Sequence, residues 1–290
     1  MKYLRNEPLA RHTTFKIGGP AKYFCAPKSI NELKKSLLFA KENNLKVSII
    51  GSGSNLLISD KGFDGLIINP KISGIVIKGT DVLAGSGISI QYLLNILAKK
   101  GLSGLEFMTG IPGSVGGSVC MNVGTGKEEI GGKVVRIWAI DQSQKAKVKS
   151  QNECKFDYRK SIFQNGKFII TKVQFKLKKG RPADIKAKIK DLWKKRLAKQ
   201  PYNMPSAGSI FKNPKGDFAG RLIEAAGLKG MRIGDAQVSE KHANFIVNLG
   251  KGKADDVLKL IAHIQKKVKK KFDIKLETEV KPQVALKLNS

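Results

Sequence analysis

The chain has 290 residues, and its 54 Lys and Arg residues outnumber its 23 Asp and Glu residues, giving a formal net charge of +31. With 41% hydrophobic residues, the composition excludes a disordered tail or a lone peptide module, and the length fits two domains with cores of their own. Only eight of the 54 basic residues are arginine, the residue that base readout favours, so we expect a solvated basic surface rather than a specific nucleic-acid partner.

The first half of the chain alternates helix and strand patterns. Ser29 with Glu32 has the pattern of a capping box and predicts a helix start, and the apolar run 47–50 predicts a buried strand that ends in a glycine loop. A second helix is predicted from Ser89 to Lys100, with Tyr92 and Leu93 among its inward residues. From residue 134 to 177 the pattern predicts strands.

The second half begins after the charged segment 178–183, whose Gly and Pro predict a domain boundary. A helix follows that carries an apolar stripe and must end before Pro201; the stripe consists of Ile185, Ile189, Trp193 and Leu197. A short helix near 217–226, the strand-like run 245–248 and an amphipathic helix over 254–271 complete the pattern. The sequence therefore predicts an α+β protein with domains at 15–180, broken near residue 70, and at 184–290.

The three cysteines, Cys25, Cys120 and Cys154, are widely spaced and have no neighbouring ligand pattern. We expect reduced thiols and no metal site. The N-terminus has no apolar core of a secretory signal, and no segment approaches the roughly 18 apolar residues of a membrane span. We therefore expect a cytoplasmic protein without membrane insertion, present as a monomer or a weak oligomer.

The first glycine loop consists of Gly51, Ser52, Gly53, Ser54 and Asn55, directly after the predicted strand. Glycines at such a position let consecutive backbone N–H groups converge on a phosphate, and serine hydroxyls add further donors. The loop is neither a Rossmann fingerprint nor a Walker loop, because the third glycine of the first and the Gly-Lys-Ser/Thr of the second are missing. A tight hairpin is the alternative reading of this segment.

The second loop, 109–122, is denser in glycine and lies in an apolar setting. Its candidate ligand-binding residues are Gly110, Pro112, Gly113, Ser114, Gly116, Gly117 and Asn122. Because glycine is costly to order and permits very close approach of a ligand, we favour binding over a purely structural turn. Two such loops suit a bulky dinucleotide.

A third loop carries Ser209, Lys212 and Asn213 in the sequence SAGSIFKNP. It is not the nucleophile elbow of hydrolases, since Phe211 stands where the last glycine of that motif belongs. From this segment alone, a turn residue is one reading of Ser209, and the segment assigns it no chemical role.

Six segments in this order resemble one family over about residues 13–280. They are TTFKIGGPAKYF, GSGSNLLISDKGFDG, GLSGLEFMTGIPGSVGGSVCMN, FDYRKSIF, KQPYNMPSAGSIFKNP and LETEV, and together they resemble UDP-N-acetylenolpyruvoylglucosamine reductase, a flavoenzyme family of peptidoglycan precursor synthesis. The resemblance implies a two-part FAD-binding domain of the vanillyl-alcohol-oxidase (PCMH) type, with noncovalent FAD on the first two loops, followed by a smaller α+β substrate-binding domain. It also implies NADPH as co-substrate and a UDP-sugar as substrate.

The resemblance also implies roles for single residues. Arg159 and Glu279 match the active-site pair of the family, and Ser209 matches its proton donor; Lys199 and Asn213 fall where the family contacts the UDP portion. A fixed guanidinium suits the negative charge that develops when hydride adds to a double bond conjugated to a carboxylate. Because a serine hydroxyl is a weak acid, a neighbouring cation such as Lys212 is expected to assist it.

Two departures from the family pattern concern the substrate end. The run MNVGTGKEE lacks the tyrosine of the family's turn and has Lys127 where a glycine is expected, and the chain between Arg159 and Lys199 has no room for the tyrosine-bearing lid of one subgroup. The chain therefore resembles the subgroup without that lid. The alternatives are a flavin oxidoreductase of the same fold with another substrate, and a basic nucleic-acid-binding protein.

Overall fold

The computed structural model describes residues 1–282. Near the N-terminus, β1 (Leu4–Pro8), β2 (Pro20–Cys25), β5 (Phe63–Ile68) and β3 (Lys46–Ile49) form a sheet in the order β1-β2-β5-β3. Strands β2, β5 and β3 are parallel, and β1 is antiparallel to β2. Helix α1 (Ile30–Glu42) begins at the predicted Ser29, whose hydroxyl accepts from the N–H of Glu32 at 3.1 Å, and it packs its buried Leu33 and Leu37 on this sheet.

The second sheet is antiparallel throughout, in the order β12-β11-β13-β7-β6. Its strands are β12 (Ala146–Ser150), β11 (Val134–Asp141), β13 (Phe168–Lys176), β7 (Asp81–Gly85) and β6 (Ile75–Lys78). Helices α2 (Ile90–Lys99) and α3 (Val115–Cys120) contribute to the same apolar core. Helix α2 starts at the predicted Ser89, but Tyr92, predicted to face inward, is 57% exposed. The buried face of α2 includes Leu94 and Ala98 in place of Tyr92. This face is wider than the single stripe that the sequence predicts.

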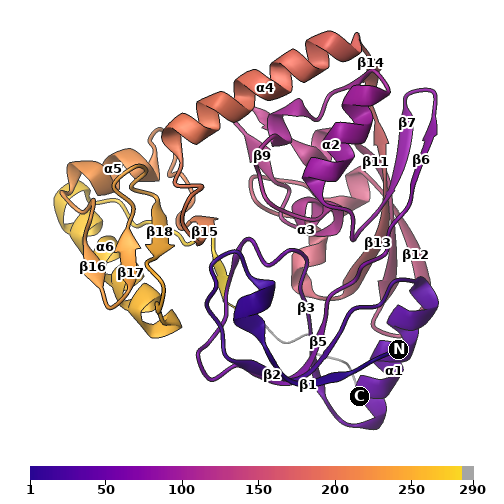
Figure 1. The fold of residues 1–290 in the computed structure, drawn as a ribbon, viewed down its shortest axis with the longest axis horizontal. Coiled ribbons are helices and arrows are strands. Elements are labelled where there is room, and N and C mark those ends of the chain that lie inside the picture. The colour runs from indigo at the N-terminus through magenta and orange to yellow at the C-terminus, as the bar shows by residue number, and fades with distance from the viewer. Residues whose placement is uncertain (283–290) are drawn as a thin grey trace.

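Helix α4 (Pro182–Lys199) runs along one side of the molecule and connects the part with α2 and α3 to the C-terminal part (Figure 1). Its predicted apolar stripe is largely not buried: Ile185 is buried, whereas Trp193 and Leu197 are each 39% exposed. Helix α4 bridges two parts of the molecule, so only the residues at its start pack into a core. The residues of the stripe near its end therefore stay partly exposed.

The C-terminal part has a small antiparallel sheet in the order β15-β18-β17-β16. Its elements are β15 (Ser206–Ser209), β18 (Phe245–Asn248), β17 (Ala236–Val238), β16 (Arg232–Ile233), α5 (Ala219–Ala225) and α6 (Ala254–Phe272). Three two-stranded pairs complete the described chain: β9 (Gly124–Thr125) with β10 (Glu128–Glu129), β8 (Leu102–Ser103) with β14 (Lys178–Lys179), and β4 (Leu56–Leu57) with β19 (Lys281–Pro282). The mixed, segregated helices and sheets confirm the predicted α+β class.

The C-terminal part shares its core with the N-terminal segment. Phe15, Ile17 and Leu57 lie in the same apolar cluster as residues of β15, β17, α5 and α6. The carboxylate of Asp60 accepts hydrogen bonds from the first N–H groups of α6, at 3.0 Å from Ala254 and 3.3 Å from Asp255. The predicted domain limits remain predictions, but these contacts join the C-terminal part tightly to residues 13–60.

Candidate active site

A cavity of about 1450 Å³ lies where the N-terminal sheet, the second glycine loop and the C-terminal part meet. Fifteen of the eighteen predicted site residues line it: Gly51, Ser52, Gly53, Ser54, Asn55, Gly110, Pro112, Gly113, Ser114, Gly116, Gly117, Arg159, Ser209, Asn213 and Glu279. This volume exceeds the roughly 300–1,000 Å³ of a typical small-molecule site. The cavity therefore has room for a dinucleotide and a second ligand together.

The first glycine loop folds tightly because its neighbours leave no space for side chains. Gly53 has φ +64°, and a Cβ there would lie 2.0 Å from the carbonyl oxygen of His12. A Cβ on Gly51 would lie 2.6 Å from Ser114 Oγ. Within residues 1–282, the N–H groups of Ser52 and Gly53 donate to no protein acceptor, so they remain available to a ligand in the cavity.

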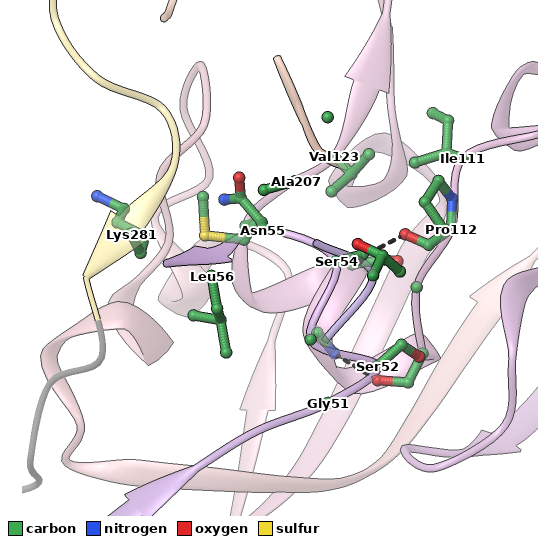
Figure 2. A pocket seen from close by; sticks show the side chains of 18 of the residues that line it. Gly51, Ser52, Ser54, Asn55, Leu56, Ile111, Pro112, Val123, Ala207 and Lys281 are labelled. Carbon is green, nitrogen blue, oxygen red and sulfur yellow. Dashed lines mark hydrogen bonds between the residues drawn. The ribbon is translucent and has the colours of Figure 1, made fainter. Parts of the chain in front are cut away.

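The two glycine loops are joined side by side. Ser54 Oγ donates to the carbonyl of Pro112 at 2.8 Å, a contact that Figure 2 shows across the pocket. On the far side of the second loop, the N–H of Gly116 donates to the carbonyl of Ser86 at 2.9 Å, and a Cβ on Gly116 would lie 2.8 Å from the Cβ of Ser86. The second loop is thus held between the first loop and Ser86, the residue that follows β7.

These loops fit a flavin dinucleotide. Free backbone N–H groups meet closely packed glycines on one wall of a large cavity, the arrangement that anionic and planar ligands require. Ser86 Oγ, also in the wall, is buried and has no hydrogen-bond partner in the part of the chain that the structure describes. A buried hydroxyl without a partner loses about 1–3 kcal/mol, which a ligand in the cavity could restore.

Arg159 and Glu279 form an ion pair in the cavity, with Nε and Oε1 2.6 Å apart and both side chains mostly buried. Arg159 has φ +55°, and its guanidinium also donates to the carbonyl of Gly124 at 3.2 Å. Its backbone carbonyl accepts from Gln164 at 2.8 Å. Asp157, two residues before Arg159, lies instead near Lys160, with 3.8 Å between the charged atoms.

Two opposing effects act on Glu279. Burial raises the pKa of its carboxyl above the ordinary value, and the Arg159 guanidinium, the next largest influence, lowers it; burial prevails. The neighbouring Glu277 differs, because its exposed carboxylate pairs with Lys212 at 3.1 Å and its pKa is lowered. Of these two carboxyls, Glu279 is therefore the one that belongs to the cavity.

Ser209 and Glu279 are brought together by the backbone. Ser209 ends β15, and the next residue, Ile210, accepts the N–H of Glu279 at 2.7 Å. Within the described residues the Ser209 hydroxyl makes no hydrogen bond, so it is free to face a ligand. One wall of the cavity thus carries a hydroxyl, a carboxyl and a guanidinium from three distant segments.

Three predicted residues lie outside the cavity lining. Asn122 is fully buried beneath it, where its side chain bonds the N–H of Gly131, the carbonyl of Asp157 and the carboxylate of Glu129. Lys199 is exposed at the end of α4, and Lys212 is held by Glu277. Asn213 does line the cavity, and its side-chain oxygen accepts from the N–H of Ala219 at 3.1 Å.

Sequence reasoning did not identify several residues of the cavity wall, among them Ser86, Arg196 and Tyr202. Arg196 donates to the hydroxyl of Thr125 at 2.6 Å and to the carbonyl of Phe107 at 3.2 Å. It therefore holds the atypical turn β9–β10 against α4. The sequence did offer a signal: Trp193 and Tyr202 are aromatic residues in and just after a helix that is otherwise rich in charge.

The described residues contain no group of three or more His, Cys, Asp or Glu arranged to hold a metal ion. Their three cysteines are free thiols. No helix within residues 1–282 has both the length and the apolar character needed to cross a membrane.

Comparison with known proteins gives matches along most of the chain. Residues 21–138 match the family described as FAD binding domain, and residues 200–282 match the family described as UDP-N-acetylenolpyruvoylglucosamine reductase, C-terminal domain. The UDP-N-acetylenolpyruvoylglucosamine reductases of Caldanaerobacter subterraneus and Carboxydothermus hydrogenoformans are 42% and 47% identical, covering 97% and 96% of this chain and 93% and 92% of their own.

A solved structure agrees over the whole fold. The crystal structure of UDP-N-acetylenolpyruvylglucosamine reductase from Thermus caldophilus has a TM-score of 0.84 and 35% identity, and the match covers 98% of both chains. Together with the family matches, it confirms the predicted FAD-binding domain followed by a smaller α+β domain.

Proposed function

The chain belongs to the UDP-N-acetylenolpyruvoylglucosamine reductase family and is a flavoprotein oxidoreductase; from this membership we propose that it reduces UDP-N-acetylglucosamine enolpyruvate to UDP-N-acetylmuramate, with NADPH as reductant, in peptidoglycan precursor synthesis. The observation that carries the proposal is one cavity that combines a glycine-rich amide cradle with Arg159, Glu279 and Ser209.

The residues that would hold FAD are those of the two glycine loops, with the free N–H groups of Ser52 and Gly53 as donors. When bound there, FAD would supply a site that accepts hydride from NADPH and passes it to the double bond of the substrate. The tight contacts at Gly51, Gly53 and Gly116 keep this wall flat and close to the ligand. A side chain at any of these positions would clash with neighbouring protein atoms and displace the loop that forms this wall.

We assign Arg159 to the carboxylate of the substrate. Hydride addition leaves negative charge that is delocalised onto this carboxylate, and a fixed guanidinium stabilises it, which typically contributes about 3–4 kcal/mol. The contacts with Gly124 and Glu279 hold the guanidinium in place before substrate arrives. Burial raises the pKa of the Glu279 carboxyl, and the Arg159 guanidinium opposes that shift.

We assign proton donation to Ser209. The carbanion formed by hydride addition needs one proton to complete the reduction, and the Ser209 hydroxyl lies in the cavity next to the segment that carries Glu279. A serine hydroxyl needs a nearby proton source or cation. Lys212 points to Glu277, whereas Lys281 lines the cavity, so Lys281 is the better placed of the two.

An anaerobic spectrophotometric titration tests the proposal. Purified protein should show the visible absorption of bound oxidised flavin, lose it on adding NADPH, and regain it on adding UDP-N-acetylglucosamine enolpyruvate. Protein that neither contains nor takes up flavin would contradict the whole proposal. Reduced protein that the UDP-sugar fails to reoxidise would favour a flavin oxidoreductase with another substrate.

Other properties stay at the level of prediction. We expect the chain to act as a monomer or a weak oligomer, without a specific nucleic-acid partner. These expectations rest on the composition and the resemblance.

A further inference from the structure

The linker from Gln200 to Pro205, between α4 and β15, forms a wall with space on both sides. All six residues line the main cavity, and Gln200 to Met204 also line a second cavity of about 350 Å³ on the other side. The backbone of this wall leads directly into Ser206–Ser209. Its position therefore affects both the cavity and the strand that carries Ser209.

Tyr202 connects this wall to the second glycine loop. Its hydroxyl donates to the carbonyl of Gly110 at 2.6 Å, and its ring packs on that of Trp193, with centroids 5.0 Å apart. Gly110 has φ +75°, and a Cβ there would lie 2.9 Å from the Trp193 ring and from Cδ of Arg196. The loop thus contacts the end of α4 at Gly110. Any other residue at this position would displace the side chains of Trp193 and Arg196.

The contact belongs to a regular pattern of anchored carbonyls. Gly110 accepts from Tyr202, Pro112 from Ser54 Oγ at 2.8 Å, and Gly113 from the N–H of Ile90 at 2.9 Å. In a trans peptide the C=O and the following N–H point in opposite directions. The N–H groups of Gly113 and Ser114 follow the Pro112 and Gly113 carbonyls; they are therefore turned away from those anchors, and within residues 1–282 they donate to no protein acceptor. The N–H that follows the Gly110 carbonyl, that of Ile111, donates to the carbonyl of Met108 at 3.0 Å, so Tyr202 fixes the entry to the loop and not a free N–H directly.

We infer that Tyr202 is a positioning residue for the cofactor: its phenol anchors the start of the second glycine loop and thereby presents the loop's free N–H groups to FAD. The inference rests on the proposed function, because it takes FAD as the ligand of this loop. It adds a residue from the C-terminal half of the chain to the cofactor site. Through this hydrogen bond, the position of the linker is coupled to that of the loop.

The protonation state of Tyr202 supports this role. Burial raises the pKa of its phenol above the ordinary value of 10.0, and the nearby Arg196 lowers it by less. The hydroxyl consequently stays a donor through the neutral range. Arg196 is the charged group that acts on this phenol.

Tyr202→Phe removes the hydroxyl and keeps the ring on Trp193. A neutral hydrogen bond contributes on the order of 1 kcal/mol, so we expect the dissociation constant for FAD to rise about 3- to 10-fold, together with a shift of the flavin's visible absorption maxima. The matched control is Tyr3→Phe. Tyr3 is also half-buried, also packs on an aromatic ring, Phe39, and also donates to a backbone carbonyl, that of Lys35 at 3.4 Å, but it lies outside the cavity lining.

The melting temperature of the flavin-free protein separates positioning from stability. If Tyr202 has only a structural role, Tyr202→Phe and Tyr3→Phe will lower this temperature while leaving FAD affinity and spectrum unchanged, and the inference is overturned. An equal loss of FAD affinity in both variants also overturns it. Wild-type protein that binds no FAD would overturn the proposed function as well, whereas wild type that binds FAD with Tyr202→Phe indistinguishable from it overturns only the role of Tyr202.

Discussion

Ser209 is the residue whose chemical role can be isolated most cleanly, because its hydroxyl makes no hydrogen bond within the described chain. Ser209→Ala should leave NADPH oxidation by the flavin intact and slow reduction of the UDP-sugar by about 10²- to 10⁴-fold. Stopped-flow measurement of the two half-reactions checks this. Ser206→Ala, on the same strand and also in the cavity wall, is the control; equal losses in both half-reactions for Ser209→Ala would mean a structural role.

Glu279 should make the fold less stable as it ionises. Because burial raises its pKa in the folded chain above the ordinary 4.5, the folded state holds the proton more tightly than the unfolded chain. The free energy of unfolding therefore falls as pH rises from the ordinary value through the raised one. Glu279→Gln cannot ionise and escapes this loss.

The measurement is the melting temperature of Glu279→Gln minus that of wild type. This difference should increase as the pH rises through and above the ordinary value of 4.5, since effects of other titrating groups cancel. A difference that decreases over the same range would mean that the Arg159 ion pair outweighs burial.

At the scale of elements, the first glycine loop depends on contacts that a side chain would break. Gly53→Ala places a Cβ 2.0 Å from the carbonyl of His12 at φ +64°. We expect loss of FAD binding and destabilisation beyond the roughly 1–2 kcal/mol of the left-handed backbone alone. Gly79→Ala is the control, at φ +60° in a turn with nothing within 4 Å. FAD content and melting temperature distinguish them; equal effects would mean that only the backbone conformation matters.

The elements that the sequence predicts well are those fixed by local signals. Ser29 caps α1 as expected, α2 starts at the predicted Ser89, and α6 buries Val257, Ile261 and Ile264 along its predicted face. The predictions fail where a neighbour decides which face is covered, as at Tyr92, which is exposed. Tyr202 is the opposite case: a residue of an irregular linker acquires its role only through Gly110, 92 residues away.

At the scale of the whole molecule, local patterns do not determine the site. Arg159 and Glu279 are 120 residues apart in sequence, and only the resemblance to a family related them before the fold was known. The same resemblance nominated Lys199, and the need of Ser209 for a nearby cation nominated Lys212; the structure places both outside the cavity lining. The composition of the loops predicts that a ligand binds there. Which distant segments come together around that ligand can be known only from the fold.

The shared core predicts that the C-terminal part does not fold alone. Residues 184–290 expressed separately lack Phe15, Ile17 and Leu57, which are almost fully buried in its core, and Asp60, which caps α6. We expect circular dichroism of this fragment to show no cooperative thermal transition, with the whole chain measured alongside as reference. A cooperative transition in the fragment would show that the core tolerates the loss.

The same arrangement has a consequence during synthesis. Phe15 and Ile17 leave the ribosome early, but their packing partners extend to α6. At about 5–20 residues per second, translation reaches the end of α6 roughly 10 to 50 s later. Throughout that interval the nascent chain carries an uncovered apolar patch, so a stalled or truncated product never buries it and should be a substrate for chaperones and proteases.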